Sequence, residues 1–318
     1  MFGVYKDIAI MGIETIFPHT RIQNVQCKTY EEALGSRKVK KQIKLTGIDS
    51  CYVARTETTE DMCVSAAEKL ISRLNWDKSE IRGIILVTQT PSFVMPSTAF
   101  AIQKRLGIGE DCIVFDMNLG CSGYTSGLTV AGGMLSNMEE GSKMLLLVGD
   151  TLTKCLEKED YQNRLMFGDA GTATALEKVS DSKMIYMQKS LGENYDKIIM
   201  KDSADCFHMD GMEVFRYTID QVVGYVREFM ERAALQEEDI DYYIFHQAQK
   251  YIVDNIVGFV GIEKEKVLIS YDTHGNTGGA SIPVTIAKHR ELFSGKRTRV
   301  LLCGFGVGLS CGIVYTII

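Results

Sequence analysis

Seven apolar runs rich in β-branched residues punctuate the chain, and they are continuous rather than alternating. The runs are IRGIILVTQT (81–90), CIVFDMNL (112–119), KMLLLVGD (143–150), DYYIFHQ (241–247), KVLIS (266–270), RVLLCGF (299–305) and CGIVYTII (311–318). A continuous apolar run is typical of a strand that is covered on both faces. We therefore predict that these seven segments are buried strands.

Helical patterns separate the predicted strands. The segment TTEDMCVSAAEKLISRL (58–74) carries apolar residues at helical spacing and opens with Thr58 or Thr59 as a cap. Because strands and helices alternate along the chain, the pattern predicts the α/β class.

The chain also carries an approximate internal repeat. CIVFDMNLGCSGYTSGL, followed by a helix and KMLLLVGD, parallels VLISYDTHGNTGGASIP, followed by a helix and RVLLCGFG. A duplicated α/β unit would bring Cys121 and Asn276, one in each glycine turn, near one pseudo-twofold axis; generic α/β periodicity is the alternative explanation. We place the boundary between an N-terminal half, residues 1–175, and a C-terminal half, residues 176–318.

Composition narrows the class of protein. Of 318 residues, 45% are apolar and 24% are charged, with only 4 Pro, which indicates a compact globular chain. No apolar stretch reaches membrane-spanning length, and the N-terminal MFGVYKDIAI carries charges where a signal peptide needs an apolar core. We therefore expect a soluble, cytoplasmic protein with no membrane partner. A net charge of −6 argues against nucleic acid as a partner.

One segment of this negatively charged chain is rich in basic residues. It is SRKVKKQIK, residues 36–44, and it includes Lys38, Lys40 and Lys41. Such a run is either a solvated helix face or a docking site for an acidic partner.

The chemistry-bearing residues are few. Nine cysteines include no C-x-x-C pair, which argues against a structural zinc site, and most of them read as small buried hydrophobes. Cys121 differs because it stands between Gly120 and Gly123, where an apolar run ends and small residues begin. A helix that begins near Cys121 would lower its thiol pKa and favour the nucleophilic thiolate. His246 and Asn276 follow, each at the end of a predicted strand.

In this order, and with these flanking motifs, the sequence resembles the thiolase superfamily and most closely the β-ketoacyl-acyl-carrier-protein synthase III family. The resemblance spans nearly the whole chain. Its motifs are LTGIDSCYVARTETTEDMCVSAAEKLI, VMPSTAFAIQKRLGI, LLLVGDTLTK, MFGDAGTATAL, HQAQ, GNTGGASIP and GFGVGLSCG.

The resemblance implies a thiolase-like fold, with duplicated α/β halves in a layered αβαβα arrangement, and a two-step acyl transfer. Cys121 would attack an acyl thioester and carry the acyl group. His246 and Asn276 would donate hydrogen bonds to the thioester oxygen of a malonyl substrate as it loses CO₂. The backbone N–H groups of Cys121 and Gly306 would form an oxyanion hole. No cofactor and no metal are expected.

Some positions depart from the family pattern. Housekeeping members hold coenzyme A with a Trp and an Arg at the positions of Lys41 and Leu45, and with a second Arg at the position of Tyr161, three residues before Arg164. The side chains that hold the adenine of coenzyme A in those members are therefore not found at these positions. Met95 occupies the position that shapes the partner subunit's acyl pocket, and a flexible Met would admit a range of short or branched chains. These departures are typical of a specialised paralogue.

The resemblance also implies partners: acyl-carrier-protein or coenzyme A thioesters, and a second copy of the chain in a homodimer. The basic run would lie near the tunnel mouth, where Lys38, Lys40 and Lys41 would dock the acidic carrier protein. Two other functions stay open. One is a non-decarboxylating acyltransferase that moves the acyl group to an alcohol or amine, and the other is a non-catalytic subunit.

Overall fold

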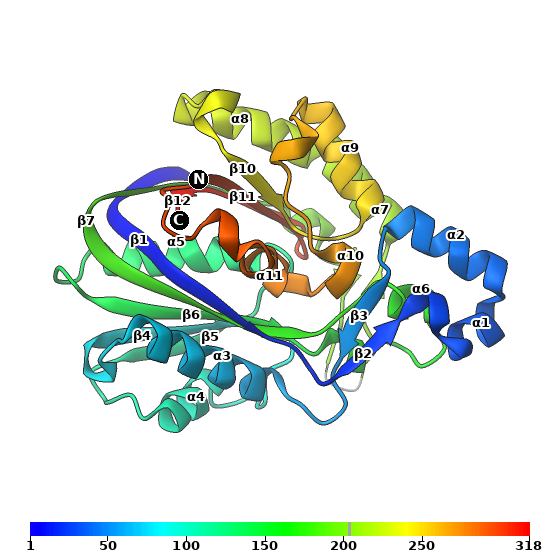
Figure 1. Cartoon of the computed structure of the whole chain (residues 1–318), viewed down its shortest axis with the longest axis horizontal. Coiled ribbons are helices and arrows are strands. Elements are labelled where there is room, and N and C mark those ends of the chain that lie inside the picture. Colours follow the sequence, from blue (N-terminus) through cyan, green and yellow to red (C-terminus); the bar gives the residue numbers. More distant parts are fainter. Residues whose placement is uncertain (203–204) are drawn as a thin grey trace.

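The structure is a computed structural model that describes residues 1–202 and 205–318 (Figure 1). Its central feature is a mixed sheet of eight strands in the order β10-β11-β12-β7-β6-β4-β5, with β1 paired to β7. The strands of this sheet are β1 (Phe2–Ile16), β4 (Ile81–Val87), β5 (Ile113–Met117), β6 (Lys143–Asp150), β7 (Ala170–Ser190), β10 (Tyr242–Phe245), β11 (Arg299–Gly306) and β12 (Ser310–Ile317). Two small two-stranded sheets pair β2 (Thr20–Gln23) with β3 (Ser50–Val53) and β8 (Ile198–Ile199) with β9 (His208–Met209).

Helices pack on the outer faces of the two ends of this sheet and also lie between these two ends. They are α1 (Lys28–Leu34), α2 (Ser36–Thr46), α3 (Thr59–Leu74), α4 (Thr98–Leu106), α5 (Gly123–Leu135), α6 (Tyr161–Arg164), α7 (Gly211–Tyr217), α8 (Val223–Ala233), α9 (Lys250–Val260), α10 (Tyr271–His274) and α11 (Ser281–Lys288). Among the described residues, no helix is both long and apolar enough to cross a membrane.

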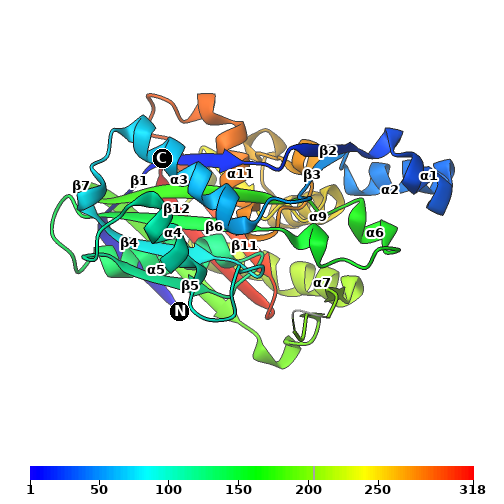
Figure 2. The same cartoon turned by 90° about the horizontal axis from the view of Figure 1, so that it is seen from below.

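Three large apolar clusters define five layers (Figures 1 and 2). Helices α3 and α4 pack on the outer face of β4 and β6, and α8 and α9 pack on the outer face of β10, β11 and β12. Helices α5 and α11 lie between the two ends of the sheet, where their apolar residues meet both inner faces. The predicted αβαβα arrangement is therefore confirmed.

A long antiparallel pair of strands, β1 and β7, joins the two ends of the sheet. Residues 170–177 of β7 pair with β6, whereas residues 185–190 pair with β12. Asp7 and Asp181 both have a positive φ, 64° and 65°, which places a bend in each strand. The predicted boundary between residues 175 and 176 falls inside β7, and the division into two halves stays a prediction.

Six of the seven predicted strands are present, but the segment 266–270 is not a strand. Only Val267 forms a parallel bridge, with Tyr243. The backbone N–H of Ser270 instead donates to the Gln247 side chain at 2.8 Å, so a side chain takes the place of a ladder partner. The predicted helix over 58–74 is confirmed as α3, with Thr58 as its cap in a reciprocal capping box with Asp61.

Candidate active site

One cavity brings together the side chains that the sequence singled out. Cys121 lies between β5 and α5, His246 follows β10, Asn276 lies between α10 and α11, and Gly306 ends β11. All four line the same cavity. Most of its other walls are apolar, and they include Leu152, Met166, Phe167, Ile198, Phe207, Met209, Val214, Ala248, Ile252, Phe305 and Val307. The chain therefore places a thiol, an imidazole and an amide in one largely apolar chamber.

The thiol of Cys121 is protonated in this environment. Burial raises its pKa to about 12, the N–H of Val307 lowers it in part, and the negative charge of Asp150 raises it further. Helix α5 begins two residues later, at Gly123, as expected. The prediction of a lowered thiol pKa is nevertheless wrong for the resting protein, because burial is the largest cause of the shift and it raises the pKa.

The end of β11 presses its backbone against Cys121. A Cβ added to Gly306 would stand 2.7 Å from the Cβ of Cys121 and 3.1 Å from its sulfur, and the φ of Gly306 is 145°. Only glycine fits this conformation and this space. The backbone of Gly306 therefore lies directly beside the Cys121 sulfur, and the oxyanion hole stays a prediction.

His246 is buried and neutral, and its tautomer follows from its neighbours. Burial lowers its pKa to about 3, a shift that the carbonyl of Gly278 offsets only in part. Its Nδ1 lies 2.8 Å from the Ser281 hydroxyl, and that hydroxyl also accepts the N–H of Gln247 at 3.2 Å. We infer that the Ser281 hydrogen points to Nδ1, which leaves the ring hydrogen on Nε2. His246 is then a neutral donor.

Asn276 is fixed by a short loop and is also arranged as a donor. Its Oδ1 accepts the N–H of Gly278 at 3.0 Å, and within the described residues its Nδ2 makes no hydrogen bond. Its backbone N–H donates to the Met166 carbonyl at 2.8 Å, and its carbonyl accepts from Gly168 at 3.0 Å. A Cβ on Gly168 would stand 2.3 Å from the carbonyl oxygen of His274, so the MFGD motif holds this loop through close backbone contact.

Sequence reasoning missed three residues of the site. Ser281 orients His246 from the first turn of α11, and Phe305 meets the imidazole edge-on with ring centroids 5.4 Å apart. Gln89, just after β4, lines this cavity and a larger one of about 590 Å³ beside it. Ser281 and Phe305 lie inside the quoted motifs GNTGGASIP and GFGVGLSCG, and Gln89 lies at the end of a predicted strand. Only the folded chain shows that these three side chains touch the site.

Met95 does not line the Cys121 cavity of its own chain. It is 87% exposed and its neighbour Val94 is fully exposed. Phe93 and Val94 line the larger neighbouring cavity. Gln89 lines both this cavity and the Cys121 cavity. The predicted role of Met95 concerns a partner subunit and stays a prediction.

The predicted docking lysines lie on α2, and Lys38, Lys40 and Lys41 are all exposed. Helix α2 packs against α9, whose N-terminal residues Gln249 and Ile252 border the Cys121 cavity. The basic surface therefore neighbours an element of the cavity wall.

The residues at the coenzyme A positions serve other contacts or face solvent. The Tyr161 ring meets Tyr30 edge-on at 6.2 Å, and the carbonyl of Arg164 accepts the Tyr30 hydroxyl at 3.0 Å. Leu45 is exposed on α2. These contacts join α1 to α6, so Tyr161 and Arg164 take part in packing this corner of the fold.

Comparison with known proteins agrees with this geometry. Residues 115–194 match the sequence profile described as 3-oxoacyl-[acyl-carrier-protein (ACP)] synthase III, and residues 230–317 match its C-terminal profile. The chain is 30% identical to the β-ketoacyl-[acyl-carrier-protein] synthase III of Coxiella burnetii, over 92% of this chain and 98% of that protein. It is 32% identical to the synthase of the same name from Clostridium perfringens, over 96% and 98%.

Comparison with solved structures points to the same family. The crystal structure of a 3-oxoacyl-(acyl-carrier protein) synthase from Burkholderia xenovorans superposes with a TM-score of 0.95 at 28% identity, covering 100% of this chain and 96% of that one. The resemblance read from the motifs is therefore confirmed. The chain belongs to the β-ketoacyl-acyl-carrier-protein synthase III family, which are acyltransferases of thiolase-like fold.

Proposed function

We propose that this chain is a decarboxylating condensing enzyme in which Cys121 carries an acyl group and His246 and Asn276 activate a malonyl thioester. One observation carries the proposal: a single buried cavity holds a thiol together with two neutral side chains that are both arranged as hydrogen-bond donors. Neutral donors stabilise an oxyanion without supplying an acidic proton to the carbanion beside it.

The first step is acyl transfer to the enzyme. The sulfur of Cys121 bonds to the acyl carbon, the thioester C–S bond breaks, and the thiol proton leaves with the departing thiol. The N–H groups of Cys121 and Gly306 would stabilise the oxyanion of the tetrahedral intermediate. Since burial keeps the resting thiol protonated, the thiolate forms only when a bound thioester is ready to take it.

The second step joins two carbon chains. The malonyl carboxylate leaves as CO₂, and its bonding electrons pass into the enolate of the thioester, whose oxygen accepts hydrogen bonds from Nε2 of His246 and Nδ2 of Asn276. The enolate carbon then bonds to the acyl carbon, and the Cys121 sulfur leaves as a thiolate, which takes from solvent the one proton that the reaction consumes. Because most side chains in the cavity wall are apolar, each hydrogen bond to the enolate oxygen should be stronger there than in solution.

Transfer of the acyl group to an alcohol or amine is less compatible with this geometry. Such a transfer needs a base to take the proton of the acceptor. His246 is a weak base in this cavity, because burial holds its pKa near 3, and its Nδ1 already accepts from Ser281. We therefore favour the decarboxylating reaction.

We further propose that the chain works as a homodimer. An apolar surface of Phe93, Val94, Met95 and Phe100 is exposed close to the edge strand β5, whose first residue, Ile113, is exposed as well. In a dimer across this surface, Met95 would reach the partner's acyl cavity. Sedimentation should give a dimer at micromolar concentration, and Met95→Trp should shorten the longest acyl chain that the enzyme accepts. A monomer with unchanged chain selectivity would contradict this proposal.

The proposed function is tested by a panel of acyl thioesters. We expect incubation to add one acyl mass to the peptide that contains Cys121. Coenzyme A and carrier-protein donors of the same acyl group are compared, because the coenzyme A positions of the family carry other residues in this chain. Acylation of a different cysteine, or of none with any donor, would contradict the proposal.

A further inference from the structure

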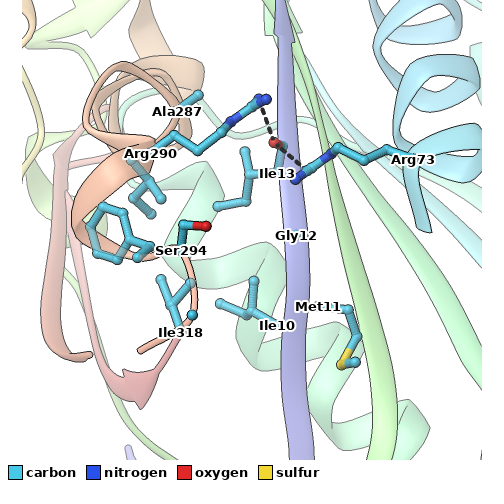
Figure 3. A pocket seen from close by; sticks show the side chains of 12 residues that line it. Ile10, Met11, Gly12, Ile13, Arg73, Ala287, Arg290, Ser294 and Ile318 are labelled. Carbon is cyan, nitrogen blue, oxygen red and sulfur yellow. Dashed lines mark hydrogen bonds between the residues drawn. The ribbon is translucent and has the colours of Figure 1, made fainter. Parts of the chain in front are cut away.

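A second cavity lies between β1 and the segment that follows α11, and it shares no residue with the Cys121 cavity (Figure 3). Its volume is about 270 Å³. It is lined by Ile10, Met11, Gly12, Ile13, Arg73, Ile286, Ala287, Arg290, Phe293, Ser294, Gly295 and Ile318. Nothing in the proposed reaction uses these residues.

Two arginines meet over one carboxylate at one end of this cavity. Arg73 from α3 and Arg290 from beyond α11 contact the two oxygens of Glu14, at 2.8 Å and 2.9 Å. Both also donate to the carbonyl of Ile13, at 3.0 Å and 3.4 Å, as Figure 3 shows. Among the described residues, Glu14 is the one carboxylate that forms an ion pair with either arginine, so two guanidinium groups face one carboxylate at this end of the cavity.

Each of the two guanidinium groups also has N–H groups that are not used in these contacts. Arg73 uses Nε and Nη2, and Arg290 uses Nη2. Within the described residues, the Nη1 of each arginine donates to no protein group. The side chains are 38% and 48% exposed, so a ligand can reach them. A guanidinium with two free N–H groups is well suited to a second carboxylate.

Most of the other side chains that line the cavity are aliphatic or aromatic, and Ser294 adds a hydroxyl. Ile10 and Ile13 come from β1, Ile286 comes from α11, and Phe293 and Ile318 complete the surface. In Figure 3, Ile10 and Ile318 lie on one side of the cavity and the two guanidinium groups lie on the other. The cavity therefore has a cationic end and an apolar end.

We propose that this cavity binds a small aliphatic monocarboxylate, with its carboxylate on Arg73 and Arg290 and its alkyl chain on the isoleucine surface. The charge selects an anion, and the apolar walls select an anion with a tail. The volume lies just below the ~300 Å³ at which pockets for drug-sized ligands begin, which favours a short or medium chain.

The arginines also have a structural role that must be separated from this one. Among the described residues, β1 pairs with β7 and with no other strand, so its other edge is open, and the two arginines donate to the Ile13 carbonyl on that edge. They also join α3 to the segment after α11 through Glu14. Those contacts leave the Nη1 donors unused, so a substitution that fills the cavity and keeps both arginines tests binding separately from stability.

The test is calorimetric titration of the whole protein with octanoate, butyrate, 1-octanol and octylamine. We expect octanoate to bind at least tenfold more tightly than each of the other three. Butyrate lacks the tail, octanol lacks the charge, and octylamine carries the wrong charge. Octanol binding as tightly as octanoate, or no octanoate binding at all, would overturn the proposal.

Two variants and a matched control localise the binding. Arg290→Gln should weaken octanoate at least tenfold, and Ser294→Trp, at an exposed position on the cavity wall, should do the same by filling the space while keeping both arginines. Arg105→Gln is the control, because Arg105 is 39% exposed and paired with Glu60 and Asp61 but lines none of the described cavities. Thermal melting shows whether each variant is folded. Unchanged octanoate affinity in a folded Ser294→Trp protein would contradict the assignment.

Discussion

The loops that carry Cys121 and Asn276 hold corresponding places in the fold but perform different tasks. Cys121 lies between β5 and α5, and Asn276 lies between the segment 266–270 and α11, with both helices in the central layer. Strand β5 pairs with β4 over five residues, whereas the second segment keeps only the bridge from Val267 to Tyr243. Similar surroundings thus hold a nucleophile in one loop and a hydrogen-bond donor in the other.

The difference lies in how each loop is held. Cys121 is enclosed by backbone, because Gly306 packs directly on its side chain. Asn276 is held by hydrogen bonds to Met166 and Gly168 and by its own Oδ1. The first arrangement brings backbone close to a sulfur that must form bonds, and the second fixes the orientation of an amide that only donates a hydrogen bond. The loop residues, not the strand order, therefore set the chemistry.

The largest expected effect comes from the first loop. Cys121→Ser should abolish acyl-enzyme formation and leave the fold intact, because an alcohol is a far weaker nucleophile than a thiol. Mass spectrometry of the intact protein measures the adduct. Cys112→Ser is the control, since Cys112 is half-buried outside the cavity. An acyl adduct that still forms on the Cys121→Ser protein would show that the Cys121 loop does not hold the nucleophile.

The second loop should affect only the second step. Asn276→Ala should slow condensation by about 10²–10³, the usual cost of losing one oxyanion donor, while acyl loading of Cys121 changes little. Loading is followed by mass and condensation by formation of the ketoacyl product. If loading and condensation fell together, the division of tasks between the loops would be wrong.

A third prediction concerns the dry interior that both loops depend on. Burial raises the pKa of Asp150, which lies near Cys121, to about 7. A raised carboxyl pKa contributes stability that is full below its unfolded value and is lost as pH rises to about 7. The free energy of unfolding of the wild type should therefore fall between pH 4 and 7 relative to Asp150→Asn, by an amount on the order of a few kcal/mol.

Chemical denaturation at several pH values measures this slope. Asp169, whose pKa burial raises to about 6, remains in both proteins and should leave a shared residual slope. Identical slopes in wild type and Asp150→Asn would show that Asp150 is not held in a desolvated site.

The smallest expected effect is at the docking surface. Replacing Lys38, Lys40 and Lys41 with Glu should raise the apparent KM for carrier-protein thioesters severalfold, more at low salt, while small thioester mimics are spared. Lys69→Glu, on the exposed side of α3, is the control. Equal loss on both kinds of substrate would indicate a structural role for the basic run, and no loss on either would place docking elsewhere.

Much of this arrangement can be read from the sequence, and the exceptions have physical causes. Continuous apolar runs marked six strands because those strands are covered on both faces. Strands β1 and β7 escaped notice because polar and charged residues interrupt them where they bend at Asp7 and Asp181. The segment 266–270 resembles a strand, but the Gln247 side chain takes the N–H of Ser270.

The motifs also identified the residues that meet in the cavity, but not their electrostatics. A helix start near Cys121 predicted a lowered pKa, and burial reverses the sign. Burial depends on side chains from distant segments such as Phe305 and Leu152, which no local pattern reports. The same is true of Ser281, whose role depends on His246 lying beside it.

The central claim is that the two loops act together to join carbon chains with loss of CO₂. The most direct test loads Cys121 with an acyl group, adds a malonyl thioester and measures CO₂ and ketoacyl product together. The account predicts that they appear in equal amounts, and that Asn276→Ala slows both while leaving Cys121 acylated. Transfer of the acyl group to an added alcohol or amine, with no CO₂ released from the malonyl thioester, would contradict it.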